Sequence, residues 1–228
     1  MSTKLNLRDL KQYDLDKYEE WDIWKLFPQH RWLFNKLELS IRLGYSCGPT
    51  PMPVSKTTEY VIRPIYNLSG MGAGAYIKTL EKDKIYDFSP SLFWCERFIG
   101  DHLSVNYVWQ QDKFYEVQTT LADTNYNNLS RFNKWALVSN RNIKLPRWLD
   151  DLKDVKYINI EFIDNKIIEI HLRWGIDFPE GATEIVPVWS TDDPNKIDNY
   201  KSIGYNFVKD YMDAEKNLLD PRLGFLYK

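Results

Sequence analysis

The sequence has little of what marks several common classes of protein. Its two cysteines, Cys47 and Cys95, are too few and too far apart in the sequence for a disulfide framework or a cysteine-ligated zinc site, and they fit a reducing cytosol. No run of about eighteen apolar residues is present, which excludes a membrane-spanning helix. The first thirty residues carry charges throughout, so we expect no secretory signal peptide. These features together predict a cytoplasmic protein.

The sequence also lacks a strong excess of either charge. It has 30 Lys and Arg residues and 32 Asp and Glu residues, which gives a net charge of −2. A broad basic surface is therefore absent, and we do not expect a nucleic-acid partner. A hydrophobic content of 43% over 228 residues predicts a packed core, in one large domain or two small lobes.

The hydrophobic patterns predict more strands than helices, so the expected fold class is α+β. We expect helices over residues 31–44, ended by Gly44, and over residues 205–219. The expected strands cover residues 59–65, 75–80, 102–110 and 113–122, and a hairpin lies within 155–175. These elements are joined by a loop at 45–58, a connector at 91–100 and an irregular stretch with helical turns at 123–152. We divide the chain into an N-terminal arm or helix (1–30), a main domain (31–190) and a C-terminal helix and tail (191–228).

Three of the ten glycines, Gly70, Gly72 and Gly74, lie within five positions and define what we call the glycine-rich loop. Glycine adds nothing to a core and costs backbone entropy, so packing does not explain this cluster. The pattern G-x-G-x-G between two strands matches neither the phosphate loop nor the dinucleotide motif, both of which open a helix. Two interpretations remain: a phosphate-binding loop with Arg63 at its base, or a mobile hairpin tip.

The hairpin "INIEFIDNKIIEIHLR" places several polar side chains on one face. If residues 164–166 form a three-residue loop, Glu161 lies opposite Glu169 and Asn159 lies opposite His171. Two opposed carboxylates repel unless a positive charge lies between them, and a divalent cation such as Mg²⁺ would supply it. Removing one acid would then leave the metal-free fold as stable as before or slightly more so. A two-residue turn would instead separate the glutamates, and an ordinary solvent-facing polar surface is the other interpretation.

Taken in order, these segments resemble the ATP-grasp fold, in which two α+β lobes clamp ATP. The stretch "EYVIRPIYNLSGMGAGAYI" looks like the strand, cationic residue, proline and glycine-rich loop of that family. "WCERFIGDHLSVNYVW" is similar to the hinge between the lobes, and "IEFIDNKIIEIHLR" to the metal-binding strands. The resemblance implies a nucleotide lobe at about 55–95 and a metal-binding lobe at about 100–190. "RPIYNLSGMGAGA" also resembles uncharacterised short proteins of marine bacteriophages.

The resemblance implies a role for each residue that matches the nucleotide-binding motifs. Arg63 stands where a phosphate-binding lysine is usual, and the glycine-rich loop would cover the β- and γ-phosphates. Lys36 lies near the position of a second phosphate-binding lysine; the other interpretation is a solvated helix residue. Glu96 and the backbone amide of Ile99 would contact adenine. His102 would contact the ribose, or it lies on the plain surface.

The resemblance also implies a metal site and a reaction. Glu161 and Glu169 match the metal-binding acids, His171 replaces an asparagine, and Arg173 matches the arginine that steadies the phosphate and the intermediate. The cofactors would be ATP and Mg²⁺, or Mn²⁺ because histidine is a softer ligand. The implied activity is that of a carboxylate–amine ligase acting on an unidentified small-molecule or peptide carboxylate. The alternative is a nucleotide-binding or structural phage accessory protein that has lost turnover.

Overall fold

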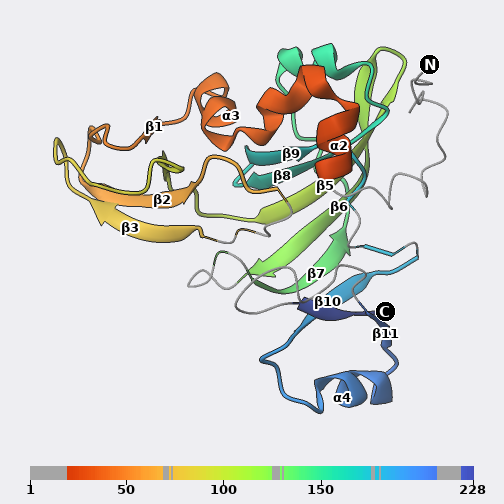
Figure 1. Cartoon of the computed structure of the whole chain (residues 1–228). Coiled ribbons are helices and arrows are strands. Elements are labelled where there is room, and N and C mark those ends of the chain that lie inside the picture. Colours follow the sequence, from red (N-terminus) through yellow and green to blue (C-terminus); the bar gives the residue numbers. More distant parts are fainter. Residues whose placement is uncertain are drawn as a thin grey trace.

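The computed structural model describes residues 20–68, 72, 74–124, 129, 131–175, 178, 179, 181–209 and 222–228. Two antiparallel sheets dominate these residues, with a few short helices beside them, as Figure 1 shows. The fold class is α+β, as the sequence predicts. None of the described helices has the length and apolar character needed to cross a membrane.

The helical segments of the described chain are all short. They are α2 (Glu20–Leu26), η2 (Pro28–Phe34), α3 (Lys36–Arg42), η3 (Arg147–Leu152) and α4 (Lys196–Ser202). The helix expected over residues 31–44 is thus two segments divided at Asn35, whose side chain accepts a hydrogen bond from the Glu38 amide and caps α3. Gly44 follows α3 with φ +74°, so the predicted glycine stop is confirmed.

The smaller sheet has four strands in the order β1-β4-β2-β3. Its strands are β1 (Cys47–Pro49), β2 (Thr58–Pro64), β3 (Tyr76–Leu80) and β4 (Leu92–Glu96). The expected β2 and β3 are confirmed, but the prediction of a connector at 91–100 was wrong, because β4 is the central partner of both β1 and β2. Cys47 lies directly opposite Cys95 in this sheet, and both are free thiols.

The larger sheet has eight strands in the order β11-β12-β10-β7-β6-β5-β8-β9. Its strands are β5 (His102–Gln110), β6 (Lys113–Thr124), β7 (Phe132–Val138), β8 (Tyr157–Ile163), β9 (Lys166–His171), β10 (Glu184–Trp189), β11 (Asn206–Lys209) and β12 (Arg222–Tyr227). The prediction of an irregular stretch at 123–152 missed β7, although η3 supplies the expected helical turns. The expected helix at 205–219 was wrong at its start, which is strand β11; residues 210–219 lie outside the described residues.

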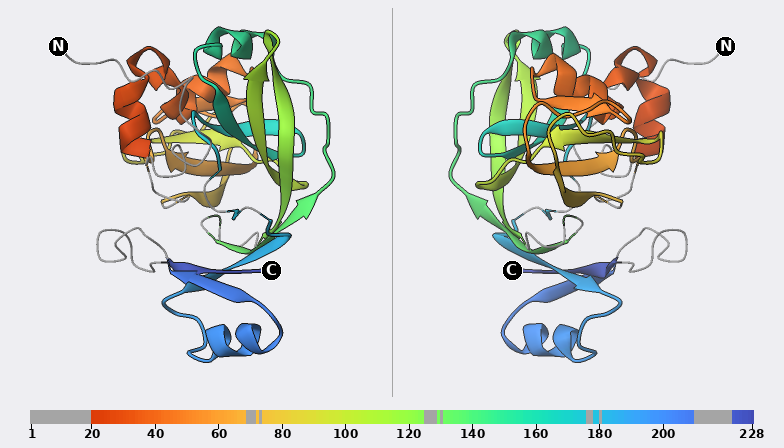
Figure 2. Two further views of the ribbon diagram at one scale, coloured as in Figure 1. Left: turned by 90° about the vertical axis from the view of Figure 1, so that its right-hand side faces the viewer. Right: turned by 90° about the vertical axis from the view of Figure 1, so that its left-hand side faces the viewer.

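The C-terminal strands extend the larger sheet. β12 pairs with both β10 and β11, and α4 lies beside them at the end of the molecule far from α2 (Figures 1 and 2). The division of the chain at residues 30 and 190 remains a prediction.

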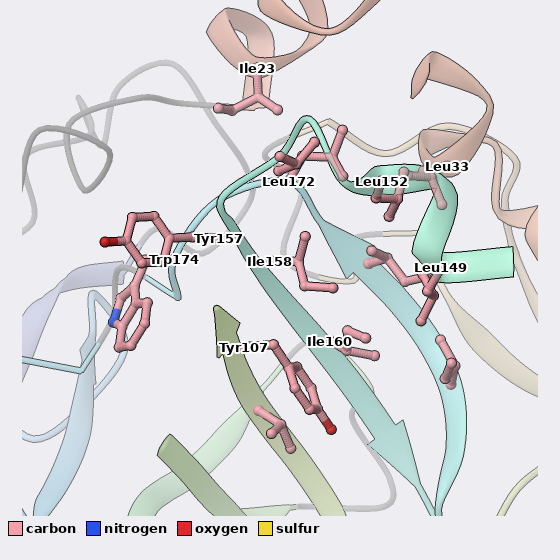
Figure 3. Close-up of a cluster of buried hydrophobic side chains, with 14 of the residues drawn as sticks. Ile23, Leu33, Tyr107, Leu149, Leu152, Tyr157, Ile158, Ile160, Leu172 and Trp174 are labelled. Carbon is pink, nitrogen blue, oxygen red and sulfur yellow. The ribbon is translucent and has the colours of Figure 1, made fainter. Parts of the chain in front are cut away.

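The main core lies between β8, β9 and the helices that cover them. Figure 3 shows Leu33 of η2 with Leu149 and Leu152 of η3 gathered on one side of β8, beside Ile158 and Ile160. These five side chains are at most 2% exposed. Because side chains alternate along a strand, burying Ile158 and Ile160 turns the intervening residues of β8 to the opposite face. The core therefore determines which face of the hairpin carries its polar side chains.

The β8–β9 hairpin has the predicted pairing of residues, but its turn differs from the predicted one. Asp164 and Asn165 both have positive φ, 51° and 59°, and Ile163 pairs with Lys166, so the turn has two residues and the expected three-residue loop was wrong. A β-bulge between Glu161 and Phe162 then shifts the register by one residue. Glu161 therefore lies opposite Glu169, and Asn159 opposite His171, as the sequence predicts. The bulge restores the shared face that a two-residue turn alone would lose.

Candidate functional site

Ionisable side chains from six elements, and one that follows the last of them, meet between the two sheets. We call this group the charged cluster. Its members are Glu20 (α2), Lys36 (α3), Arg63 (β2), His102 (β5), Glu161 (β8), Glu169 and His171 (β9) and Arg173, which follows β9. Every member except Glu20 is a predicted site residue.

Lys36 and Arg63 approach Glu169 from the side of the smaller sheet. The Lys36 ammonium donates a hydrogen bond to Glu169 Oε1, and Arg63 Nη2 lies 3.8 Å from Glu169 Oε2. The Lys36 amide also donates to the Ile65 carbonyl at 2.8 Å, which fixes the start of α3 beside the end of β2. Burial lowers the pKa of Lys36, and Glu169 opposes that effect. The side chain of Lys36 is only 6% exposed, so the prediction of a solvated helix residue is excluded.

Two histidines hold Glu161. His102 Nε2 lies 3.1 Å from Glu161 Oε2, and His171 Nε2 lies 3.8 Å from Glu161 Oε1. Burial alone would raise the pKa of Glu161, but the two histidines hold it well below its usual range. The ring of His102 also packs edge-on against Trp135, with the ring centroids 5.1 Å apart. His102 is therefore a member of the charged cluster rather than a plain surface residue.

Glu20 joins His171 to Arg173. Its Oε1 atom lies 2.7 Å from His171 Nδ1, 3.0 Å from Arg173 Nε and 2.9 Å from Arg173 Nη2. Burial alone would raise the pKa of Glu20, but His171 and Arg173 outweigh it and lower the pKa to about 2. Burial alone would lower the pKa of His171, but Glu20 and Glu161 raise it to about 10. At neutral pH His171 is therefore an imidazolium.

Sequence reasoning missed Glu20, although a signal was present. Glu20, Ile23 and Phe27 lie at helical spacing and are all buried, at 6%, 0% and 5% exposure. A carboxylate on the apolar face of a short helix requires a partner, since an unpaired buried charge is costly. The spacing thus places Glu20 on the apolar face of the helix and predicts a cationic or hydrogen-bonding partner, but it does not say which residue that partner is.

The cluster neutralises the opposed carboxylates with side chains. Cationic groups of Lys36, Arg63 and His171 lie within 4.0 Å of Glu169, and His171 also approaches Glu161. The repulsion that suggested a metal is therefore relieved within the protein. Among the residues that the structure describes, no group of three or more His, Cys, Asp or Glu side chains is arranged to hold a metal ion.

A small pocket opens beside the cluster. Its lining combines the charged side chains of Glu20, Lys36, Glu169 and His171 with Asn67 and with apolar residues. The apolar lining consists of Leu33, Phe34, Leu68 and Ile170. The lining of the pocket therefore combines positive and negative groups with hydrocarbon.

The glycine-rich loop leaves the smaller sheet next to Arg63. Gly72 and Gly74 have φ of +75° and +77°, a conformation that favours glycine. A Cβ atom on Gly74 would come within 3.3 Å of the Pro64 ring. Gly70 lies outside the described residues. The two described glycines thus lie just before β3, where the Ala75 amide donates to the Gly72 carbonyl at 3.0 Å.

The hinge segment connects β4 to β5 and rests on the β8–β9 turn. The Ser46 amide donates to the Glu96 side chain at 3.0 Å, and the side chain of Ile99 is 64% exposed. Gly100 has φ +154°, and a Cβ atom there would lie 2.8 Å from Asp164. The hinge is therefore packed against the hairpin that carries Glu161, with its Ile99 side chain turned to solvent.

Solved structures with the same arrangement identify the fold. The chain is similar to carboxyaminoimidazole ribonucleotide synthase from Aspergillus clavatus complexed with ATP (TM-score 0.52, 11% identity, covering 93% of this chain and 74% of that one). It is also similar to N5-carboxyaminoimidazole synthetase from Staphylococcus aureus complexed with ADP (TM-score 0.53, 8% identity, 93% and 74%). The L-amino acid ligase from Bacillus licheniformis gives a TM-score of 0.52 (8% identity, 89% and 68%). The chain has the ATP-grasp fold.

Similarity at this level of identity concerns the fold. No protein-family model and no curated protein matches the sequence. Within the ATP-grasp fold of this chain, Arg63 and Glu96 lie on the four-stranded sheet, whereas Glu161 and Glu169 lie on the eight-stranded sheet. The charged cluster joins these two groups of predicted site residues.

Proposed function

We propose that the protein binds ATP between its two sheets and uses it to activate a carboxylate for capture by an amine. The observation that carries this proposal is the convergence of Lys36 and Arg63 with Glu161 and Glu169 in the charged cluster. The similar structures, a synthase complexed with ATP, a synthetase complexed with ADP and an L-amino acid ligase, support the same class of reaction.

The nucleotide would lie along the smaller sheet. Lys36 and Arg63 would bind the phosphate oxygens, and the glycine-rich loop (Gly70, Gly72 and Gly74) would close over them. Glu96 and the backbone of Ile99 would contact adenine, and His102 would approach the ribose. The exposed side chain of Ile99 is compatible with a role that uses only its backbone.

The donor set fits a divalent cation that arrives with the nucleotide. Glu161 and Glu169 are opposed carboxylates, the hard oxygen ligands that Mg²⁺ and Mn²⁺ accept. Their present partners, Lys36, Arg63 and the histidines, could turn to phosphate oxygens and free them. His171 is the third predicted ligand; its Nε2 atom lies 3.8 Å from Glu161 Oε1 and 4.0 Å from Glu169 Oε1, and it would release its proton on binding the metal. The cation would neutralise phosphate charge.

The proposed reaction uses this chain's residues for positioning and charge neutralisation. A carboxylate oxygen attacks the γ-phosphorus, the bond to the bridging oxygen of ADP breaks, and an acyl phosphate and ADP result. An amine then attacks the acyl carbon, phosphate leaves with the bonding electrons, and the amine loses a proton. Lys36, Arg63 and Arg173 would stabilise the oxygens that gain negative charge in these steps.

A second candidate is a nucleotide-binding protein without turnover, as in an accessory protein of a bacteriophage. One observation favours it: Arg173, the predicted catalytic cation, is held at 2.9–3.0 Å by Glu20. For either candidate we propose a cytoplasmic location, in the host cytoplasm if the protein is of phage origin, since Cys47 and Cys95 are free.

A thermal-shift panel with ATP, ADP and GTP, each with Mg²⁺, Mn²⁺ or chelator, tests the proposal. We expect ATP with metal to raise the melting temperature, because a ligand that binds only the folded state stabilises it. Arg63→Ala should lose the shift, whereas Arg42→Ala, an exposed arginine on α3, should keep it. No shift with any nucleotide would refute both candidates. If ATP does raise the melting temperature, a second assay separates the two candidates. Formation of ADP from ATP only when carboxylates and amines are added would favour the ligase over the binding protein.

A further inference from the structure

The only two cysteines of the chain face each other across the smaller sheet. Cys47 of β1 is paired directly with Cys95 of β4, and both are free thiols. Directly opposite side chains project from the same face of a sheet, so the two thiols lie on one side of it. In the next pair of the ladder, the Glu96 amide donates a hydrogen bond to the Ser46 carbonyl at 2.8 Å. Hydrogen-bonded and non-hydrogen-bonded pairs alternate along an antiparallel ladder, so Cys47 and Cys95 form a non-hydrogen-bonded pair.

This kind of pair has the spacing that a disulfide bond requires. The Cα atoms of a non-hydrogen-bonded pair are about 4.5 Å apart, and its side chains lie closer together than those of a hydrogen-bonded pair. A disulfide bond spans Cα separations of about 4.4–6.8 Å, so neither strand has to move to form it. We propose that Cys47 and Cys95 are a redox modification site, at which a reversible disulfide bond joins β1 to β4.

The surroundings of the two thiols favour a disulfide bond over a zinc ion. A structural zinc site needs four ligands, and among the residues that the structure describes no group of three or more His, Cys, Asp or Glu side chains is arranged to hold a metal ion. Cys47 is partly exposed, whereas Cys95 is 6% exposed and its Sγ atom lies 3.9 Å from Ser40 Oγ of α3. One accessible thiol beside a protected one suits a two-step exchange, in which the first meets the oxidant and the second resolves the intermediate.

The oxidant would be a small disulfide such as oxidised glutathione. The Cys47 thiolate attacks one sulfur of that disulfide, its S–S bond breaks, and one glutathione leaves as a thiolate. The Cys95 thiolate then attacks the Cys47 sulfur of the mixed disulfide, and the second glutathione leaves. The two cysteines lose two electrons and two protons, and the oxidant becomes two molecules of reduced glutathione. Burial raises the pKa of Cys47 to about 11, and the neighbouring Cys95 adds to this effect, so the exchange is slow at neutral pH.

A bond between these residues would enclose most of the smaller sheet. The segment between them contains β2, the glycine-rich loop and β3. β1 has three residues and lies at the edge of the sheet beside β4. A disulfide bond stabilises a protein mainly by restricting the unfolded chain, and more so when the enclosed segment is long. We therefore expect the oxidised protein to melt at least about 4 °C above the reduced protein.

Mass spectrometry and thermal unfolding of the whole chain test the proposal. The protein is incubated with oxidised glutathione at about pH 9, where more of the thiol is ionised, and the products are trapped with acid. We expect wild type to lose the mass of two hydrogen atoms, to melt at the higher temperature, and to regain its starting mass in dithiothreitol. Cys95→Ser should gain one glutathione and stop there. Cys47→Ser, whose remaining thiol is buried, should stay unmodified.

Several results would overturn the proposal. They are a wild-type protein that stays reduced or stops at the mixed disulfide, a disulfide bond that joins two chains, and an internal disulfide bond that does not raise the melting temperature. The last result would mean that the bond forms only when the pair leaves its place in the sheet. The wild-type protein carries these measurements, so they decide the matter even if a serine variant does not fold. No nucleotide takes part, so the outcome is independent of the proposed function.

Discussion

Replacing Glu169 by glutamine tests whether the charged cluster stabilises the fold. The substitution keeps the size of the side chain but leaves the ammonium of Lys36, whose side chain is 6% exposed, without its carboxylate. Breaking a buried ion pair by removing one partner costs about 3–5 kcal/mol, because the remaining charge stays buried. For a chain of this length, 1 kcal/mol moves the melting temperature by about 2–4 °C, so we expect a loss of at least about 6 °C.

Urea denaturation of a double-mutant cycle measures the interaction directly. Lys36→Met should cost only about 1–2 kcal/mol, because Glu169 keeps Arg63 at 3.8 Å and remains 26% exposed. The double variant Lys36→Met, Glu169→Gln should lie within about 1 kcal/mol of wild type, since an apolar side chain then replaces the buried charge. The two single costs sum to about 4–7 kcal/mol, so a double variant that loses up to about 1 kcal/mol gives a coupling energy of about 3–6 kcal/mol.

Glu184→Gln is the matched control. Glu184 is 23% exposed, close to the 26% of Glu169, but its cationic partner Lys134 is 41% exposed and can turn to water. Its other partner, the Tyr205 hydroxyl, can still donate to the amide oxygen of a glutamine. We therefore expect a cost below about 1 kcal/mol. If Glu169→Gln costs no more than this control, the ammonium of Lys36 is not held by Glu169, and the account of the cluster is wrong. Two opposed carboxylates without cationic partners would give such a neutral result, because removing one of them also removes their repulsion.

Further predictions concern pH, phosphate binding and the hinge. Without ligands, stability should be highest between pH 4.5 and 6.5, because it is lost as the pH falls toward 2, where Glu20 is protonated, and as it rises toward 10, where His171 loses its proton. In Glu20→Gln, the melting temperature should fall less than in wild type at both the acidic and the alkaline end of the pH range. An unchanged pH profile would contradict the pairing of Glu20 with His171. Arg63→Ala should weaken ATP binding by about 1.5–3 kcal/mol in calorimetry with the fold intact; equal affinity would exclude Arg63 as a phosphate ligand. At the hinge, Ile99→Val should be silent and Ile99→Pro, which lacks the amide, should abolish binding; equal affinity for ATP and GTP would count against the adenine contact.

Strand alternation made the hairpin predictable. Residues two apart along a strand share a face, so Glu169 and His171 could be placed together from their spacing, and the pairing with Glu161 and Asn159 is confirmed. The turn could not be predicted, because a two-residue turn with a bulge and a three-residue loop give the same pairing at Glu161. The order of hairpin, hinge and glycine-rich loop was sufficient to suggest the fold that the structure has.

Strands with weak or unusual patterns were predictable only from their partners. β4 and β7 lie in segments that carry no clear alternation, and they become strands because neighbouring strands offer them hydrogen-bonding edges. The four residues of β11 likewise pair with β12, although their spacing is compatible with a helix. Tertiary pairing decided these segments against local propensity.

The sequence by itself determined which side chains share a strand face, where the glycine-rich turn lies and which charges are available. Only the tertiary structure decided how those charges are paired. Lys36 and Glu169 are 133 residues apart, and Glu20 and His171 are 151 apart. Local periodicity carries no information over such distances, because a helix or a strand relates only residues a few positions apart. The partners met because burying the apolar faces of α2, α3 and β9 in one core brought their charged residues to the same edge.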